Sequence, residues 1–329
     1  MYFFRREKIQ CRYQFSLRDA VDTALLQRAL TTALASAPYY TQRLVQEKRE
    51  MWLEPNTEPC LVYPGSTMRN IPEQTNGYLF CISCEGDTVY FDWHHFLLDG
   101  HGVSPLFTSI LEQYCNLRYG TAFAVQQIVC DPPYDMQAML AEYPPVEGGS
   151  DAIQRDVVQT YEGALRRTRM CLSKQSLVEK ALENNAKPVS ALMSLLCMAM
   201  REYLGKEKIQ YSYSSDTRDV AGVPHALYNC VCSFEHTVQL QAHTRLVDLV
   251  SDIDADIKRD LQPQSKRRRM TEQMGWVYKV DQQKAPLRIK QRVFQMGEYI
   301  GGTISDFWLS YLGNPLLPAT PELEQYTKD

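Results

Sequence analysis

The sequence predicts an α/β protein built from two lobes, each a mixed sheet with helices. Strand-like runs of alternating apolar and polar residues interleave along the chain with segments in which apolar residues recur at helical spacing. Between Ala124 and Asp151 this periodicity stops and proline and glycine accumulate, which is typical of a linker between lobes. We therefore expect an N-terminal lobe over residues 1–147 and a C-terminal lobe over residues 148–329.

The composition is that of an ordinary globular protein. The chain has 329 residues, of which 44% are hydrophobic and 22% charged, so it can bury a large core. A net charge of −4 gives no electrostatic basis for binding nucleic acid or a membrane surface. The N-terminus does not have the pattern of a signal peptide, and no apolar run reaches the length of a membrane span. A cytoplasmic location is expected.

In the first half, alternation predicts a strand over residues 8–17 and helical periodicity predicts a helix over 21–34. Residues 51–76 are rich in proline, asparagine and glutamate and are expected to be mostly loop. Residues 77–84 and 88–95 then predict a hairpin across a short glycine-containing turn. A helix follows, with Ser104 as its expected N-cap and Pro105 as its first residue.

The second half continues the alternation of strands and helices. The expected elements are a strand over 168–172, a helix capped by Ser173, a helix capped by Ser190, a strand from 209, a strand over 228–238, and a helix over 246–257. Ten cysteines are scattered through apolar segments, which is typical of free buried thiols. Cys81 and Cys84 have a CxxC spacing, but residues three apart in a strand face opposite ways, so no metal or redox role is expected there.

The most informative stretch is FDWHHFLLDG, residues 91–100, which ends a strand and leads into a helix. Because successive strand side chains point to opposite faces, His95 shares a face with Trp93 and other large apolar groups, whereas His94 points the other way. His95 is therefore expected to be partly buried and held in place. Gly100 and Gly102 permit the tight turn that follows.

Residues 94–100, HHFLLDG, resemble the HHxxxDG motif of an acyltransferase superfamily. This superfamily includes chloramphenicol acetyltransferase, the condensation domains of nonribosomal peptide synthetases, plant BAHD acyltransferases and alcohol acetyltransferase-like proteins. Residues 37–44 are also similar to a stretch near the start of the family's N-terminal lobe. The resemblance implies two chloramphenicol acetyltransferase-like lobes with the active site in a tunnel between them. By comparison with the family, the C-terminal lobe of this chain is short at its C-terminus.

The resemblance also implies roles for the motif residues. His95 is the implied general base, which takes a proton from an acceptor as it attacks a thioester, without an acyl-enzyme. Histidine suits this role because its ordinary pKa lies near neutrality. His94 is implied to pack and orient, and Asp99 and Gly100 complete the catalytic motif. The implied partner of Asp99 is Arg218 in the stretch DTR, for which the alternative is a turn residue facing water.

Three further residues are candidate substrate contacts. Trp93 lies on the same strand face as His95. Asn229 lies in a stretch similar to the family's GN turn, although the glycine is missing. Ser310 lies in a stretch similar to the family's SNxG strand, but with Tyr311 where asparagine is common. The alternative for Ser310 is an ordinary strand serine.

The resemblance thus implies an acyltransferase whose co-substrate is acyl-CoA or a phosphopantetheine thioester, with no permanently bound cofactor. The acceptor would be a small-molecule alcohol or amine. Two alternatives stay open, a condensation-like domain whose donor is attached to an acyl carrier protein, and a non-catalytic binding or assembly protein of the same fold. A metal site formed by His95, Asp99 and His101 is not expected. The basic run over 266–269 is either a solvated face or a contact for the phosphates of the donor.

Overall fold

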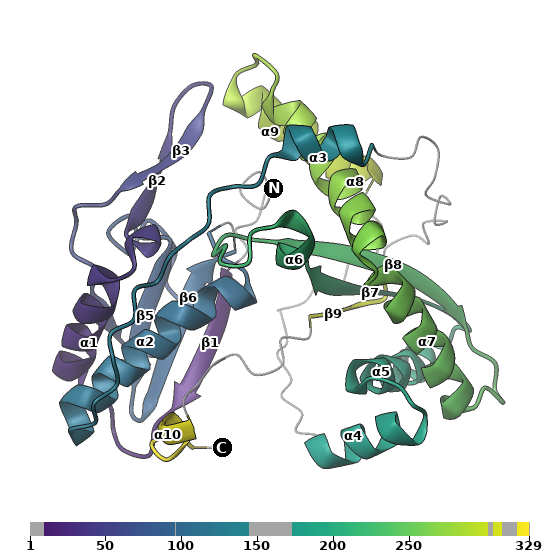
Figure 1. Ribbon diagram of the computed structural model, residues 1–329, viewed down its shortest axis with the longest axis horizontal. Coiled ribbons are helices and arrows are strands. Elements are labelled where there is room, and N and C mark those ends of the chain that lie inside the picture. The colour runs from purple at the N-terminus through teal and green to yellow at the C-terminus, as the bar shows by residue number, and fades with distance from the viewer. Residues whose placement is uncertain (1–9, 96, 145–172, 302–304, 311–320, 329) are drawn as a thin grey trace.

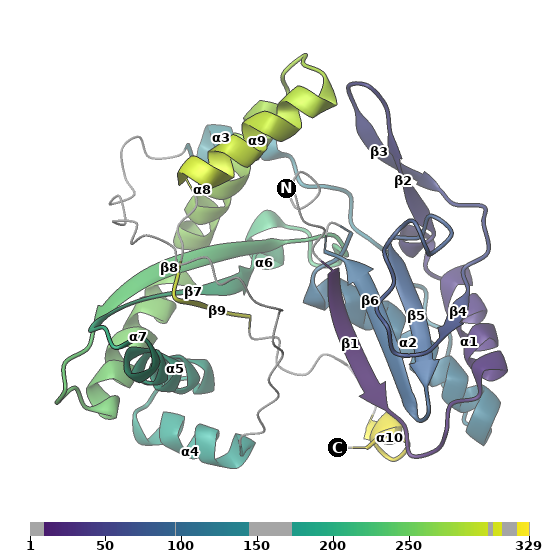
Figure 2. The ribbon, with the colours of Figure 1, turned by 180° about the vertical axis from the view of Figure 1, so that it is seen from behind.

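The protein is described by a computed structural model, which covers residues 10–95, 97–144, 173–301, 305–310 and 321–328. It is a mixed α/β protein, as the sequence predicts, and Figure 1 shows two lobes side by side. Figure 2 shows the same arrangement from behind, with the sheet of each lobe exposed to view. Among the described residues, no helix is long and apolar enough to cross a membrane.

A four-stranded sheet forms the centre of the N-terminal lobe. Its strands, in the order β1-β6-β5-β4, are β1 (Gln10–Ser16), β6 (Thr88–His94), β5 (Phe80–Glu85) and β4 (Val62–Pro64). β6 pairs antiparallel with both β1 and β5, so the predicted hairpin is present and β6 lies inside the sheet. The helices α1 (Thr23–Ala35) and α2 (Gly100–Tyr119) cover one face of this sheet (Figure 2).

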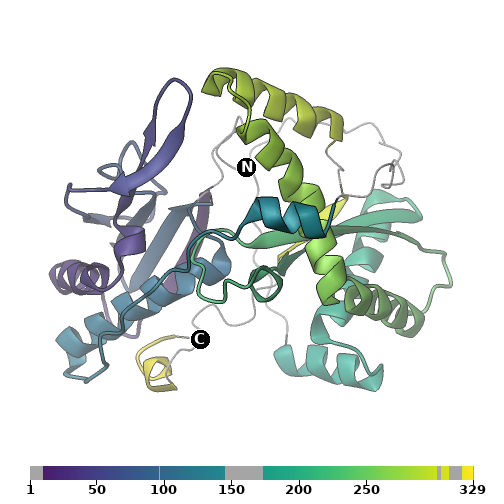
Figure 3. The same cartoon turned by 45° about the horizontal axis from the view of Figure 1, so that its top comes forward.

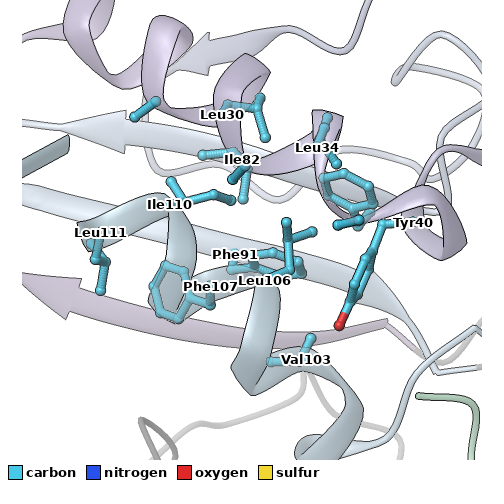
Figure 4. Close-up of a cluster of buried hydrophobic side chains, with 14 of the residues drawn as sticks. Leu30, Leu34, Tyr40, Ile82, Phe91, Val103, Leu106, Phe107, Ile110 and Leu111 are labelled. Atoms are coloured by element: carbon cyan, nitrogen blue, oxygen red, sulfur yellow. The ribbon is translucent and has the colours of Figure 1, made fainter. Parts of the chain in front are cut away.

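Apolar side chains from both helices and from the central strands form the core of this lobe (Figure 4). Phe91 on β6 is at its centre, with the ring of Phe80 stacked at 5.3 Å and the ring of Phe107 edge-on at 5.5 Å. Alternate residues of β6 point into this core, as the strand pattern predicts. The end of β6 is therefore fixed by a packed interior in which truncating one aromatic side chain typically costs about 3–5 kcal/mol.

Residues 51–76 contain more structure than the sequence predicts. β3 (Met51–Pro55) pairs antiparallel with β2 (Gln42–Gln46), which follows a short 3₁₀ helix, η2 (Pro38–Tyr40), and β4 joins the main sheet. The β2–β3 hairpin reaches toward helix α9 (Leu287–Gly301), where Met51 packs beside Leu287 and Phe294 (Figure 3). These contacts join residues that are distant in the sequence, so no local sequence pattern predicts β3.

The C-terminal lobe has a three-stranded sheet in the order β8-β7-β9. β7 (Lys208–Asp216) pairs antiparallel with β8 (Val231–Gln239) and parallel with β9 (Phe307–Leu309). The helices α5 (Pro188–Leu204) and α7 (Leu246–Asp260) pack against β7 and β8. Besides α9, the described residues of this part also form the helices α4 (Lys174–Glu183), the short α6 (Arg218–Ala221) and α8 (Pro263–Asp281).

Several predicted boundaries differ from the structure. α2 begins at Gly100 with Asp99 as its N-cap, so Ser104 and Pro105 lie inside the helix. α5 begins at Pro188, and Ser190 donates a hydrogen bond of 2.7 Å to Asp254 on α7 instead of capping. β8 begins three residues later than predicted, and α8 and α9 were not predicted. The strand predicted over 168–172 lies outside the described residues.

Two segments pack with the lobe opposite to the one expected from the boundary at 147. α3 (Met136–Glu142) lies against α8, where Arg267 donates a hydrogen bond of 3.1 Å to the Tyr143 hydroxyl. Residues 321–328, which include α10 (Pro321–Glu324), return to the N-terminal lobe. There Tyr326 stacks on Tyr119 at 4.5 Å and a β-bridge joins Leu17 to Thr327. The chain therefore crosses between the lobes more than once.

Candidate functional site

The loop that carries His95 is held by a hydrogen bond between its own backbone groups and by hydrogen bonds from neighbouring side chains. At its start, the backbone N–H of Leu97 donates to the carbonyl of His94 at 2.9 Å. The Tyr39 hydroxyl donates to the Leu97 carbonyl at 2.9 Å, and the Trp93 indole N–H donates to the Leu98 carbonyl at 3.1 Å. Residues 97 and 98 are therefore held in place although they are not in regular structure.

Trp93 is part of this support. Its side chain is buried in the core of the N-terminal lobe, edge-on to the ring of Tyr13 at 4.9 Å. With its only side-chain donor bonded to the Leu98 carbonyl, Trp93 helps to hold the loop. The substrate contact expected for Trp93 from the sequence stays a prediction.

His94 lies on the other face of β6, as the strand pattern predicts, and is buried. On the same face, two residues earlier, Asp92 forms a bidentate ion pair with Arg12 of β1, with an Nε–Oδ1 distance of 2.6 Å. Arg12 also lies over the ring of Tyr90 at 4.5 Å. On this face of the sheet the charges of Asp92 and Arg12 therefore balance each other, and the His94 side chain is buried on the same face.

Asp99 connects the two lobes. One carboxylate oxygen, Oδ1, accepts from the backbone N–H of Gly102 at 2.8 Å and from Arg218 Nη2 at 2.9 Å. The other, Oδ2, accepts from the backbone N–H of Cys230 at 2.9 Å. The residue is only 2% exposed, so these donors take the place of water around the charge. Asp99 thus caps α2 and binds the C-terminal lobe with the same carboxylate.

Arg218, at the start of α6, holds the loop that contacts the N-terminal lobe. Its guanidinium donates to the carbonyls of Ala226 at 2.7 Å and Tyr228 at 3.0 Å, and to Asp216 at 3.1 Å. Burial lowers the pKa of Arg218, but its hydrogen bond to Asp99 and the nearby carboxylates outweigh this, and the net pKa lies above the ordinary value. The charged guanidinium therefore organises residues 222–230, and the alternative of a turn residue facing water does not apply.

Gly100 and Gly102 have different surroundings. Gly100 is the first residue of α2, and its carbonyl accepts from the Tyr13 hydroxyl at 3.2 Å. At Gly102 a Cβ atom would lie 1.8 Å from the carbonyl oxygen of Leu227. Gly102 is therefore required by the close approach of the loop 222–230, and not by the turn itself as the sequence suggested.

Asn229 meets His95 across the junction of the lobes. The Asn229 Nδ2 and His95 Nδ1 atoms are 3.1 Å apart, and Asn229 Oδ1 accepts from the backbone N–H of Val231 at 3.1 Å. Because Oδ1 is engaged there, the amide NH₂ faces the ring. Nδ1 is then the acceptor, and the neutral imidazole carries its proton on Nε2.

Ser310 follows β9 and is exposed. β9 runs parallel to β7, with Leu309 opposite Tyr213, so Ser310 lies toward the end of β7 that leads to Arg218. Among the described residues Ser310 makes no hydrogen bond, and the next residue of the stretch, Tyr311, lies outside them. The role of Ser310 stays a prediction.

The remaining metal and thiol candidates do not form clusters. In the part of the chain that the structure describes, no three histidine, cysteine, aspartate or glutamate side chains are grouped to hold a metal ion. His101 is exposed on the first turn of α2. Cys84 packs into the core of the N-terminal lobe, whereas Cys81 faces the Asp92 side of the sheet. Burial and the nearby Asp92 carboxylate raise the pKa of the Cys81 thiol to about 12.

The basic run over 266–269 is mostly engaged within the protein. Lys266 is buried and pairs with Asp219, Arg267 donates to the Val220 carbonyl, and Arg269 lies 3.1 Å from Glu235. These contacts attach α8 to α6 and β8. Neither a solvated face nor a cluster of free cations describes the run, because only Arg268 among its four residues is exposed.

Sequence reasoning did not find the backbone N–H of Cys230 or the Tyr39 hydroxyl. A backbone N–H carries no sequence signal. Tyr39 lies in residues 37–44, which resemble the family. Nothing in that stretch indicates that its hydroxyl donates to the carbonyl of Leu97, 58 residues later.

No protein-family model matches the sequence, and no curated protein does. Solved structures do match. Polyketide synthase associated protein 5 from Mycobacterium tuberculosis aligns with a TM-score of 0.58 and 18% identity, over 92% of this chain and 76% of that one. The first condensation domain of the CDA synthetase aligns with a TM-score of 0.53 and 13% identity, over 82% and 72%. The epimerization domain from the third module of tyrocidine synthetase B gives 0.52 and 13%, over 79% and 69%. The chain therefore has the condensation-domain fold, which the HHxxxDG resemblance had predicted.

Proposed function

We propose that the protein transfers an acyl group from a thioester to an alcohol or amine, with His95 as the general base. One observation carries this proposal. His95 extends from a loop that Tyr39 and Trp93 hold, and its ring contacts Asn229 of the other lobe. A histidine fixed at the junction of two lobes can meet a donor and an acceptor that approach from different sides.

Acyl transfer from a thioester requires one side chain that accepts a proton and later returns it, and the His95 imidazole has this role in the proposal. The imidazole takes the proton of the hydroxyl or amine as its oxygen or nitrogen attacks the thioester carbonyl. The resulting tetrahedral oxyanion collapses, the carbon–sulfur bond breaks, and the imidazolium returns the proton to the departing thiolate. The products are an ester or amide and a free thiol, and no acyl-enzyme forms. Donors placed for the oxyanion would lower the barrier further, and Ser310 is the candidate for this role.

The contact with Asn229 defines a resting state of the base. With Nδ1 accepting from the Asn229 amide, the proton on Nε2 prevents this atom from receiving another. Rotation of the Asn229 amide would present Oδ1 to the ring, move the proton to Nδ1 and free Nε2. It would also break the hydrogen bond from Val231, a net cost of about 1 kcal/mol. We infer that acceptor binding accompanies this rotation.

Asp99 and Arg218 act as positioning residues. They touch neither the reacting atoms nor the imidazole, but their ion pair fixes the start of α2 and the loop that carries Asn229. Both sides of the His95–Asn229 contact therefore depend on them.

Product formation tests the proposal. The purified protein is incubated with a panel of acyl-CoAs and mixed alcohols and amines, then with acyl groups on the phosphopantetheine arm of a carrier protein. Mass spectrometry detects the acylated acceptor and the released thiol. We expect acceptor-dependent product with one donor class, and a rate at least about 100-fold lower in His95→Ala. His243→Ala, which changes an exposed histidine in the C-terminal lobe, is the matched control and should keep the activity.

Either of two results would overturn the proposal. The first is product formation at the same rate in His95→Ala and in the unaltered protein. The second is the absence of acylated product with both the CoA-bound and the carrier-bound donors, which would favour a non-catalytic protein of this fold.

A further inference from the structure

The outer side of α9 carries a row of exposed apolar side chains. Ile289, Val293 and Met296 are 50%, 45% and 64% exposed. Their spacing of four and three residues places them in one row along the helix. The buried apolar residues of α9, Leu287 and Phe294, face the opposite way, toward α8 and the β2–β3 hairpin. A helix packed on a protein core needs one apolar face, so the second row of α9 is open to another contact.

Basic side chains flank this row. Arg288 and Arg292 are exposed, and each precedes an apolar residue of the row by one position, so they form a second row beside it. Lys284 is exposed in the turn before the helix. Among the described residues none of these three cations forms an ion pair, whereas the Asp281 carboxylate in the same turn is paired with Lys290 at 3.6 Å. We use the name α9 surface for Lys284, Arg288, Ile289, Arg292, Val293 and Met296.

The α9 surface is presented at one end of the molecule. Figure 3 shows α9 beside the tip of the β2–β3 hairpin, and Figure 1 shows both at the same end. The backbone N–H of Leu287 donates to the Lys48 carbonyl of the hairpin at 2.9 Å, and the ring of Phe294 lies 4.9 Å from that of Trp276 on α8. Because α9 is held from its inner side, its outer side is a fixed convex surface.

The size and shape of the α9 surface restrict its partner. From Ile289 to Met296 the row is about 10 Å long. A convex row of three side chains is too small to form by itself the roughly 1,200–2,000 Å² of a stable protein interface. A lipid bilayer requires neither a groove nor a fixed area, because apolar side chains enter the boundary between headgroups and acyl chains.

The charges indicate which kind of bilayer fits. The unpaired cations of the α9 surface are complementary to the phosphates of anionic lipids, and long arginine side chains can reach these phosphates while the neighbouring apolar groups lie deeper. The net charge of −4 belongs to the whole chain, whereas the attraction between exposed charges acts within a Debye length of about 8 Å. Trp276, beside α9, is 38% exposed, and indole rings favour the boundary between lipid and water.

We propose that the α9 surface binds the surface of an anionic lipid bilayer, with Ile289, Val293 and Met296 inserted below the phosphates and Arg288 and Arg292 in contact with them. Three apolar side chains and a few cations resemble a single acyl anchor in strength, so the binding is reversible. The α9 surface includes no residue of β6 or of the loop 222–230, so this binding does not depend on acyl transfer at His95.

Co-sedimentation of the full chain with vesicles tests the proposal. One set of vesicles contains phosphatidylcholine alone, and in the other set phosphatidylglycerol replaces part of it. We expect at least about 10-fold stronger binding to the anionic vesicles, because each basic residue near such a surface contributes a factor of about 5. Raising the salt from about 0.15 M to about 1 M shortens the Debye length to about 3 Å and should release most of the protein. Soluble glycerol phosphate should not compete, because it offers no apolar layer.

One pair of substitutions tests the apolar row. Val293→Ser combined with Met296→Ser should weaken binding to the anionic vesicles at least about 10-fold, because the two side chains no longer gain from leaving water. Leu182→Ser is the matched control, since Leu182 on α4 is 71% exposed and lies outside the α9 surface. It should bind as the unaltered protein does.

A second pair tests the cations. Arg288→Gln combined with Arg292→Gln should weaken binding at least about 10-fold and reduce its dependence on salt. Arg28→Gln, at an exposed position of α1, is the matched control and should leave binding unchanged. Circular dichroism and melting temperatures confirm that each variant is folded before it is mixed with vesicles.

The proposal is overturned if the protein binds neither kind of vesicle, or binds both equally. It is also overturned if both double variants bind as the unaltered protein does, or if Leu182→Ser and Arg28→Gln lose binding to the same extent as the double variants. Competition by glycerol phosphate would assign a soluble phosphate ligand instead. Binding of an acidic amphipathic peptide, without binding of vesicles, would identify a protein as the partner of the α9 surface.

Discussion

Asp99 and Arg218 lie 119 residues apart in the chain, yet their side chains form an ion pair of 2.9 Å that is almost completely buried. Asp99 comes from the loop before α2, and Arg218 from the start of α6 in the other lobe. The pair is completed by backbone groups on both sides, Gly102 N–H for the carboxylate and the carbonyls of Ala226 and Tyr228 for the guanidinium. It is therefore a structural joint between the lobes and a support for the His95 site.

Removing one partner of this pair should be costly. In Arg218→Met the Asp99 carboxylate stays buried without its cation, and such a loss typically lowers the free energy of unfolding by about 3–5 kcal/mol. Urea unfolding followed by circular dichroism measures the change. Arg43→Met is the matched control, because Arg43 pairs with Glu54 at 2.6 Å but is half exposed, and it should cost less than about 1 kcal/mol. Equal losses of unfolding free energy in the two variants would contradict the conclusion that the Asp99–Arg218 ion pair stabilises the contact between the lobes.

Gly102→Ala should separate the lobes at the same joint. The new Cβ would lie 1.8 Å from the backbone carbonyl of Leu227, so the loop 222–230 must move. Gly275→Ala is the control, because its Cβ would meet only the tip of the Leu140 side chain, at 2.7 Å. We expect faster hydrogen exchange at the Cys230 N–H in Gly102→Ala but not in Gly275→Ala. Unchanged exchange at Cys230 in both variants would show that the loop does not depend on Gly102.

The sequence predicts the N-terminal lobe well where local patterns decide the structure. Alternation along 88–94 and the turn at Gly86 specify the hairpin, because one face of β6 is packed and the register cannot shift without exposing Phe91. The position of His95 follows only in part, because β6 ends at His94 and His95 lies in the loop after it. The start of α2 does not, because Ser104 and Pro105 form a good local cap signal that Asp99 overrides with help from Arg218.

Other parts of the fold depend on contacts that local patterns do not encode. The helix α8 was not predicted because its buried positions include Lys266, Thr271 and Gly275, which interrupt the apolar stripe by which a helix is recognised. Lys266 can be buried only because Asp219 pairs with it. The return of residues 321–328 to the N-terminal lobe likewise depends on partners such as Ser16, whose carbonyl accepts from Lys328 N–H at 2.8 Å.

The tautomer of His95 can be measured directly. With Asn229 Nδ2 facing Nδ1, we expect long-range ¹⁵N–¹H correlation spectra of the free protein to show the proton on Nε2. Asn229→Asp replaces the amide donor with a carboxylate acceptor, which should move the proton to Nδ1. Asn229→Ala removes the restraint and should give a mixture of tautomers. A proton on Nδ1 in the unaltered protein would contradict the proposed rotation of the amide, since the base would then already be prepared.

In the C-terminal lobe, Asp254 should make stability depend on acid pH. Burial alone would raise its pKa, but Lys258 at 2.6 Å, the Lys187 N–H at 3.0 Å and the Ser190 hydroxyl at 2.7 Å together lower it below the ordinary value of 3.8. The folded state therefore binds this proton more weakly than the unfolded state does. The resulting stabilisation is complete above pH 3.8 and is lost as the pH falls through the lower, folded-state pKa.

Asp254→Asn should accordingly reduce the free energy of unfolding by about 1–3 kcal/mol at pH 7, because it replaces a charged acceptor with a neutral one. The difference from the unaltered protein should shrink in urea titrations at progressively lower pH, once the pH is below 3.8. Asp252→Asn, at an exposed position of the same helix, is the matched control and should stay within about 0.5 kcal/mol of the unaltered protein. A difference for Asp254→Asn that stays constant or grows on acidification would mean that its carboxylate is not stabilised by Lys258 and Ser190, because protonation would then remove no favourable contact.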